Sequence, residues 1–196
     1  LDHPHLASVY DAGKLPDGRA YLVTKFVPGE DLAAYQRRLR PSVPLAVKLV
    51  CDVAGALAAA HEQGILHGDV KPANILVSRE GDAYLTDFGL ARHGHAGSEA
   101  GPVGGTPAYM SPEQVASESH RVDAQSDIFS LGVVLYELLS ARHPFPGRNR
   151  HEILDRILHA EPRPLSESEI PAELGRCCCR ALAKRKADRY TTAKEF

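Results

Sequence analysis

The stretch that most restricts the fold is residues 67–74, which read His-Gly-Asp-Val-Lys-Pro-Ala-Asn. Proline disfavours helix at the residue before it, and glycine, aspartate and asparagine all favour turns. The stretch therefore predicts a tight loop between more regular segments. Such a loop can bring together a carboxylate, an ammonium group and an amide, supplied by Asp69, Lys71 and Asn74.

Composition narrows the class of protein. The chain has 196 residues, of which 43% are apolar and 24% charged, with a net charge of −2. This is ordinary for one globular domain, or one domain plus a fragment, and it excludes collagen-like, coiled-coil and disordered chains. The near-zero charge gives no field that would attract nucleic acid or an anionic membrane, so neither is expected as a partner.

The cysteine pattern indicates the cellular compartment of the protein, and the ends of the chain bear on whether it is a segment of a longer one. Cys51 stands alone and residues 177–179 are consecutive cysteines, a pattern that lacks paired Cys-x-x-Cys metal spacing and favours reduced thiols in a cytoplasmic protein. We expect no membrane-spanning segment in this chain, because the longest apolar run, 129–139, is too short. Both ends look cut, so the chain is expected to be a segment of a longer protein.

Hydrophobic periodicity and turn residues predict a small β-rich start followed mostly by helix. A hairpin is expected over residues 7–27, around the turn at 15–18. Residues 75–77 and 83–86 are predicted strands, and residues 92–105 an exposed loop. Helices are predicted over 31–40, 44–63, 126–140, 150–160 and 171–184, with Ser126 and Asp127 as the candidate cap of the buried helix 126–140.

A second carboxylate follows the tight loop. Asp87 begins the sequence Asp-Phe-Gly on the turn after the next predicted hairpin, where it can approach Asn74. Two carboxylates, an amide oxygen and a lysine suit phosphoryl transfer, because hard oxygen ligands hold Mg²⁺ against phosphate and a cation offsets the charge of the transferred group.

These motifs resemble those of the protein kinase family. His67-x-Asp69-x-x-x-x-Asn74 is similar to its catalytic loop, and Asp87-Phe88-Gly89 to its metal-binding motif. Three further segments are similar to later motifs of the family: Gly105-Thr-Pro-Ala-Tyr-Met-Ser-Pro-Glu113 to the end of an activation segment, Asp127 to the buried aspartate of the central helix, and Asp188-Arg189-Tyr190 to the motif whose arginine pairs with Glu113.

The resemblance implies an α+β, protein-kinase-like fold, with residues 1–27 a remnant of the β-rich N-lobe and 28–196 a mostly helical C-lobe. It implies a serine/threonine kinase of the bacterial type that uses ATP and Mg²⁺ and acts on a protein substrate. The residues that the resemblance places in the site are Asp69, Lys71 and Thr106 for catalysis, Asn74 and Asp87 for the metal, and Thr24, Lys25, Val27, Asp31 and Leu76 for the nucleotide.

Two departures from the family pattern leave alternatives open. Gly68 stands where many kinases have an arginine that pairs with a phosphate on the activation segment, so we expect no switching through this position. The chain also holds no Gly-rich phosphate loop and no lysine of the third strand, so these residues alone should have little activity. A pseudokinase scaffold, or a small-molecule phosphotransferase similar to the aminoglycoside and choline kinases, therefore remain alternatives.

Overall fold

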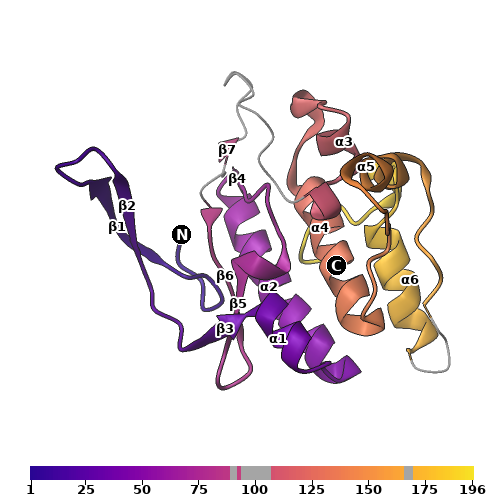
Figure 1. Ribbon diagram of the computed structural model, residues 1–196, viewed down its shortest axis with the longest axis horizontal. Helices are drawn as coiled ribbons and strands as arrows, with labels where there is room; N and C mark the ends of the chain where they lie inside the picture. Colours follow the sequence, from indigo (N-terminus) through magenta and orange to yellow (C-terminus); the bar gives the residue numbers. More distant parts are fainter. Residues whose placement is uncertain (89–91, 94–106, 166–169) are drawn as a thin grey trace.

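The computed structural model describes residues 1–88, 107–165 and 170–196, together with the backbone of residues 92 and 93 (Figure 1). The strands are β1 (Val9–Lys14), β2 (Ala20–Thr24), β3 (Gly29–Asp31), β4 (Ile65–Leu66), β5 (Ile75–Ser78), β6 (Ala83–Leu85) and β7 (Arg92–His93). The α-helices are α1 (Leu32–Arg38), α2 (Val43–Glu62), α3 (Pro112–Val115), α4 (Ala124–Ser140), α5 (Arg150–His159) and α6 (Ala172–Ala181). Short 3₁₀ turns are η1 (Pro72–Asn74), η3 (Pro107–Tyr109), η4 (Ser119–Arg121) and η5 (Lys186–Asp188).

The strands form three small antiparallel sheets. β1 pairs with β2 as a ribbon that projects from the body of the molecule (Figure 1). β3, β5 and β6 form a second sheet, in which Asp31 of β3 lies opposite Leu76 of β5. β4 pairs with β7, so residues 92 and 93, predicted as part of a loop, instead form a strand. The remainder of that predicted loop lies outside the described residues.

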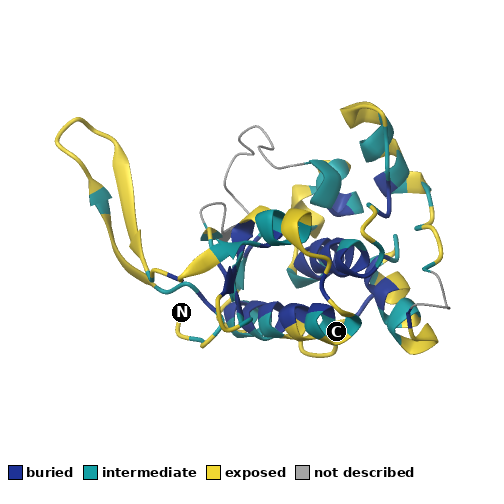
Figure 2. Ribbon diagram, turned by 60° about the horizontal axis from the view of Figure 1, so that its bottom comes forward, coloured by how far each residue is buried: buried dark blue, intermediate teal, exposed yellow. Residues whose placement is uncertain are grey.

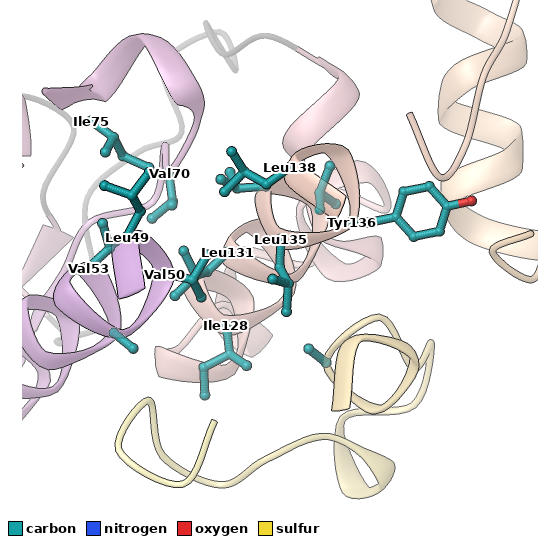
Figure 3. Packing of buried hydrophobic residues seen from close by; sticks show 14 of the residues in the cluster. Leu49, Val50, Val53, Val70, Ile75, Ile128, Leu131, Leu135, Tyr136 and Leu138 are labelled. Atoms are coloured by element: carbon teal, nitrogen blue, oxygen red, sulfur yellow. The ribbon is translucent and has the colours of Figure 1, made fainter. Parts of the chain in front are cut away.

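The core lies between α2 and α4, which pack against each other and carry much of the buried apolar surface (Figures 2 and 3). Leu49 and Val53 are buried on the apolar face that the periodic spacing of α2 predicts, and Val50 of the same helix lies toward Leu131 of α4 (Figure 3). Ser42 caps α2 by accepting a hydrogen bond from the Leu45 backbone N–H. Burial of apolar surface of this kind is the dominant favourable contribution to folding.

The N-terminal ribbon contrasts with this core. Figure 2 shows it almost entirely exposed, and the exposed fractions of Tyr10 and Phe26 are 68% and 84%. The segment before it is held to the body, because Leu6 is buried and the backbone N–H of Ala7 donates to the carbonyl of Leu85 at 2.9 Å.

The start of α4 corrects the sequence prediction. Asp123, not Ser126 or Asp127, caps the helix, and its carboxylate accepts from the Gln125 backbone N–H at 2.9 Å. Asp127 lies one turn further on and faces inward, with an exposed fraction of 1%. Its carboxylate is therefore available to other parts of the chain.

One described helix, α2, is long and apolar enough to cross a membrane by length and composition alone, with 44% of its most apolar window buried inside the fold. The expectation of no membrane-spanning segment was based on the apolar run 129–139, whereas the helix that meets the length and composition criteria is α2. Buried core helices pass the same test, so this is weak evidence of a membrane span. All four cysteines are free thiols: Cys178 is buried, whereas Cys51 and Cys179 are exposed.

Candidate active site

The tight loop predicted at residues 67–74 is anchored from beneath by Asp127. The two carboxylate oxygens of this buried residue accept hydrogen bonds from the backbone N–H groups of His67, at 3.0 Å, and Gly68, at 2.8 Å. The His61 ring lies 2.8 Å from the same carboxylate. Gly68 has a φ of 75°, a conformation that glycine adopts readily. The backbone that precedes Asp69 is therefore fixed by a side chain almost sixty residues away in the sequence.

Three of the predicted site residues meet within this loop. One oxygen of the Asp69 carboxylate, Oδ2, accepts from Lys71 Nζ at 2.5 Å and from Asn74 Nδ2 at 3.2 Å. Asn74 Nδ2 also donates to the Asp69 carbonyl at 2.8 Å. The other carboxylate oxygen, Oδ1, has no hydrogen-bond partner among the described residues. The loop thus holds a carboxylate in one orientation and leaves one of its oxygens available.

Asp87 reaches the same region through the β5–β6 hairpin. The Thr86 backbone N–H donates to the Asn74 carbonyl at 3.0 Å, and the Thr86 carbonyl lies 2.8 Å from the ring nitrogen Nε2 of the buried His67. Asp87 follows directly with a φ of 61°, left-handed backbone that costs a non-glycine residue roughly 1–3 kcal/mol. Its side chain is exposed and has no partner within the described part of the chain. Backbone strain beneath an exposed carboxylate is a common feature of functional sites.

His67 has a structural role here. Its ring packs edge-on against Phe88, with centroids 4.7 Å apart, and its exposed fraction is 0%. The ring therefore joins the segment of residues 67–74 to the Asp-Phe-Gly segment.

The residues predicted for the nucleotide lie at the base of the ribbon and on the β3–β5 pair. The backbone N–H of Lys25 donates to Ser8 and its Nζ lies 4.5 Å from the centre of the Tyr84 ring. Val27 is buried, yet its backbone makes no hydrogen bond with the described residues. Asp31 accepts from the Ala34 N–H at 2.7 Å and so caps α1.

The other two nucleotide candidates differ in setting. Leu76 is half-buried across from Asp31, and Thr24 is exposed at the end of β2. Thr106, the third predicted catalytic residue, lies outside the described residues.

A buried ion pair holds the segment after the activation-segment motif. Arg189 and Glu113 form two parallel hydrogen bonds of 2.8 and 2.9 Å, and both side chains are almost fully buried. Burial alone would raise the pKa of Glu113, but the hydrogen bonds and charge of Arg189, helped by the Ser126 hydroxyl, lower it below its usual value. The predicted pairing is confirmed.

Sequence reasoning missed Gln114. Its side-chain Nε2 donates to the Gly68 carbonyl at 2.9 Å, while its Oε1 accepts from the Ser111 N–H at 2.9 Å. The amide therefore connects α3 directly to the residue before Asp69. The Ser-x-x-Gln spacing signals a helix start, but nothing in the sequence reveals the distant contact.

Sequence reasoning also missed the pairing of Tyr109 with Glu137. The Tyr109 hydroxyl donates to the Glu137 carboxyl at 2.8 Å. Burial raises the pKa of Glu137 to about 7, although the hydrogen bond from Tyr109 acts in the opposite direction. The pKa of Tyr109 is also raised, by burial and by the neighbouring carboxylate.

The donor set fits a hard divalent cation that is shared with phosphate. The amide oxygen of Asn74 accepts no hydrogen bond from the described residues, and Asp87 presents an exposed carboxylate. No group of three or more His, Cys, Asp or Glu side chains that could hold a metal occurs among the described residues. Mg²⁺ commonly binds through one or two protein oxygens together with substrate phosphates and water.

This loop, the Asp-Phe-Gly turn and the buried pair behind them define the class of protein. The chain belongs to the protein kinase family, and the family's model, described as "Protein kinase domain", matches residues 1–196.

Among curated relatives, the chain is 38% identical to the serine/threonine-protein kinase PknB of Mycolicibacterium smegmatis and to that of Mycobacterium tuberculosis, with 100% of the chain and 33% of each relative covered. It is 41% identical to the serine/threonine-protein kinase PknL of Mycobacterium tuberculosis, with 98% of the chain and 49% of the relative covered. The chain thus spans a third to a half of these relatives. The predicted family and α+β fold are confirmed, and the family favours protein phosphorylation over the two alternatives.

Proposed function

We propose that the protein containing this chain transfers the γ-phosphoryl group of Mg·ATP to serine and threonine hydroxyls of proteins. The observation that carries the proposal is the Asp69 carboxylate, which Lys71 and Asn74 hold by one oxygen while the other remains available. A carboxylate fixed in this way can orient an acceptor hydroxyl and take its proton. The names of the relatives support the serine/threonine class of acceptor.

Each residue then has a distinct task. Asp69 Oδ1 receives the hydrogen bond of the acceptor hydroxyl and removes its proton as the phosphoryl group transfers. Lys71, already at the carboxylate, offsets negative charge on the transferred group. Asn74, by its amide oxygen, and Asp87, by its carboxylate, would hold Mg²⁺, which when bound neutralises charge between the β- and γ-phosphates.

The remaining predicted residues form the nucleotide side of the site in this proposal. The backbone of Val27, which makes no hydrogen bond with the described residues, and the carbonyl of Lys25 are suited to hydrogen bonds with adenine, and Thr24 would stand beside them. Leu76 supplies an apolar floor, and Asp31 reaches the ribose. Thr106 would mark the serine/threonine class. Residues 1–27 would belong to the N-lobe and 28–196 to the C-lobe.

We also place the domain in the cytoplasm. Cys51 and Cys179 are exposed, unpaired thiols. Such thiols persist in reducing compartments, where ATP is also available as a phosphoryl donor.

The decisive experiment compares variants of the full-length protein in the transfer of labelled phosphate from Mg·ATP to a serine/threonine peptide mixture. Asp69→Asn keeps the shape of the side chain but removes the proton acceptor, so kcat should fall about 10²- to 10⁴-fold. Asp82→Asn is the matched control, because Asp82 is an aspartate paired with Lys48 on the surface and away from the loop.

Three outcomes would count against the proposal. Undiminished transfer by Asp69→Asn would remove the assigned role of Asp69. Transfer to kanamycin or choline with none to peptides would favour the small-molecule phosphotransferase. Nucleotide binding by the full-length protein without transfer to any acceptor would favour a scaffold.

A further inference from the structure

Tyr84 of β6 lies where the chain passes twice between the ribbon and the body of the molecule. The segment that leads into the ribbon reaches β6 through Leu6 and Ala7, which pair with Leu85. The segment that leaves the ribbon reaches β6 through Lys25, whose Nζ lies 4.5 Å from the centre of the Tyr84 ring. Tyr84 is half-buried, and the proposed function gives it no task.

The contact between Lys25 and Tyr84 is a cation–π interaction. An ammonium group within about 6 Å of the centre of an aromatic ring is attracted by the negative face of the ring. Among the described residues, the Lys25 side chain forms no ion pair or hydrogen bond, so the Tyr84 ring is the partner of its charge. Lys25 is half-buried, a setting in which this attraction is stronger than at a fully exposed site.

Backbone pairing does not fix the segment that carries this lysine to the body. Within the described chain, the backbone of residues 24–26 is paired with Ser8 and Val9, at the start of the other ribbon strand. The next backbone anchor to the body is the Pro28 carbonyl, which accepts from the Arg79 N–H at 3.1 Å. The cation–π contact therefore ties residues 24–26 to β6 where backbone pairing does not.

The Tyr84 ring is itself held in place. It stands on β6 between Ala83 and Leu85, whose exposed fractions are both 0%. The His5 ring lies 6.0 Å from the Tyr84 ring at an angle of 50°, and His5 Nδ1 lies 2.9 Å from the Ala83 carbonyl. Tyr84 is also paired with Leu76 across the β5–β6 ladder, so the two side chains share one face of the sheet. A fixed ring on this face gives the ammonium group one preferred position.

We propose that Tyr84 is a positioning residue for the nucleotide, which acts by holding Lys25 and thereby the backbone that faces adenine. The inference rests on the proposed function, in which the carbonyl of Lys25 and the backbone of Val27 bind the base. Without the contact, residues 24–26 adopt other orientations as well. The apparent dissociation constant for the nucleotide then rises in proportion as the binding-competent fraction falls.

The test measures nucleotide binding and turnover of the full-length protein as separate quantities. Tyr84→Leu keeps an apolar side chain but removes the ring. In this variant the KM for ATP, and the dissociation constant for Mg·ADP measured by isothermal titration calorimetry, should rise about 3- to 10-fold. At saturating ATP, kcat and the KM for the peptide should change less than about twofold, because the loop that carries Asp69 is unaltered.

Matched variants separate the ring from the fold. Tyr84→Phe keeps the aromatic face and should restore most of the nucleotide affinity that Tyr84→Leu loses. Lys25→Met should raise the dissociation constant as Tyr84→Leu does, and the double variant should be no worse than either single variant, because both changes remove the same contact. Lys194→Met is the surface control, because Lys194 is an exposed lysine on the C-terminal segment.

Every result bears on the inference. Equal nucleotide affinities of Tyr84→Leu and Tyr84→Phe would overturn it and leave the proposed function intact. Losses that add in the double variant would overturn it too, because they would show that the two side chains act independently. If Tyr84→Leu does not fold, Lys25→Met compared with Lys194→Met carries the test, and equal affinities would again overturn the inference. Failure of the unaltered full-length protein to bind Mg·ADP would instead count against the proposed function.

Discussion

The buried pair of Glu113 and Arg189 offers the sharpest test of how this fold is held together. Arg189→Met keeps most of the volume and removes the guanidinium. The change leaves the Glu113 carboxylate buried without its partner, and it also removes donors from the carbonyls of Ala183, Gln125 and Lys184. Breaking one side of a buried ion pair costs about 3–5 kcal/mol.

This loss converts into a measurable shift. A domain of this size loses about 2–4 °C in Tm per kcal/mol, so Arg189→Met should lower the thermal transition of the kinase domain by about 6–20 °C. Differential scanning calorimetry or fluorescence of the full-length protein measures the shift. Arg176→Ala, which removes an exposed arginine paired with Glu173, is the control and should leave the transition nearly unchanged.

A double-mutant cycle decides whether the pair is the cause. Glu113→Gln removes the charge that Arg189→Met leaves unpaired, so the double variant should be less destabilised than the sum of the single variants, by about 0.5–3 kcal/mol. Single effects that add within about 0.5 kcal/mol would refute the reasoning. The pair should also weaken in acid: because the pKa of Glu113 is lowered in the fold, its contribution is present above about pH 4.5 and is lost as pH falls through the folded pKa.

Two further predictions concern the groups around the site. Because burial raises the pKa of Glu137 to about 7 from 4.5, the folded state retains a proton that the unfolded state loses, and stability should fall as pH rises from about 4.5 to 7. Glu137→Gln should flatten this slope in unfolding experiments at pH 5 and 8, whereas Glu118→Gln, on an exposed ion pair with Arg121, should preserve it; an unchanged slope in Glu137→Gln would contradict the assignment. Asp127→Asn should leave one backbone N–H of the catalytic loop without an acceptor and lower kcat about 10- to 100-fold through misplacement of Asp69, with a much smaller change in the KM for ATP; turnover equal to that of the unaltered protein would show that the anchor is dispensable.

The local elements were largely predictable from the chain. The long helix predicted at 44–63 is α2 at Val43–Glu62, and the helix predicted at 150–160 is α5 at Arg150–His159. Apolar spacing and capping residues act over one or two turns, so short-range pattern suffices for such elements. The helix predicted at 171–184 ends earlier, because α6 stops at Ala181.

The close approach of the loop residues could be predicted from the sequence, but the contacts that support the loop could not. The sequence placed Asp69, Lys71 and Asn74 in one loop, and the structure brings them together. The contacts of Asp127 with the loop backbone and of Gln114 with the Gly68 carbonyl could not be foreseen. The Asp127 and Gln114 contacts join residues 59 and 46 positions apart, and no local sequence pattern shows which distant side chain will supply a missing hydrogen-bond partner.

The sequence alone determined that Asp69, Lys71 and Asn74 are close neighbours. A short loop that contains a proline cannot place their side chains far apart. Packing of α2 against α4 settled what the chain could not, namely which buried carboxylate supports that loop. The physical reason is range. Backbone sterics act between adjacent residues, whereas burial and electrostatic contact depend on where apolar surfaces bring remote segments into register.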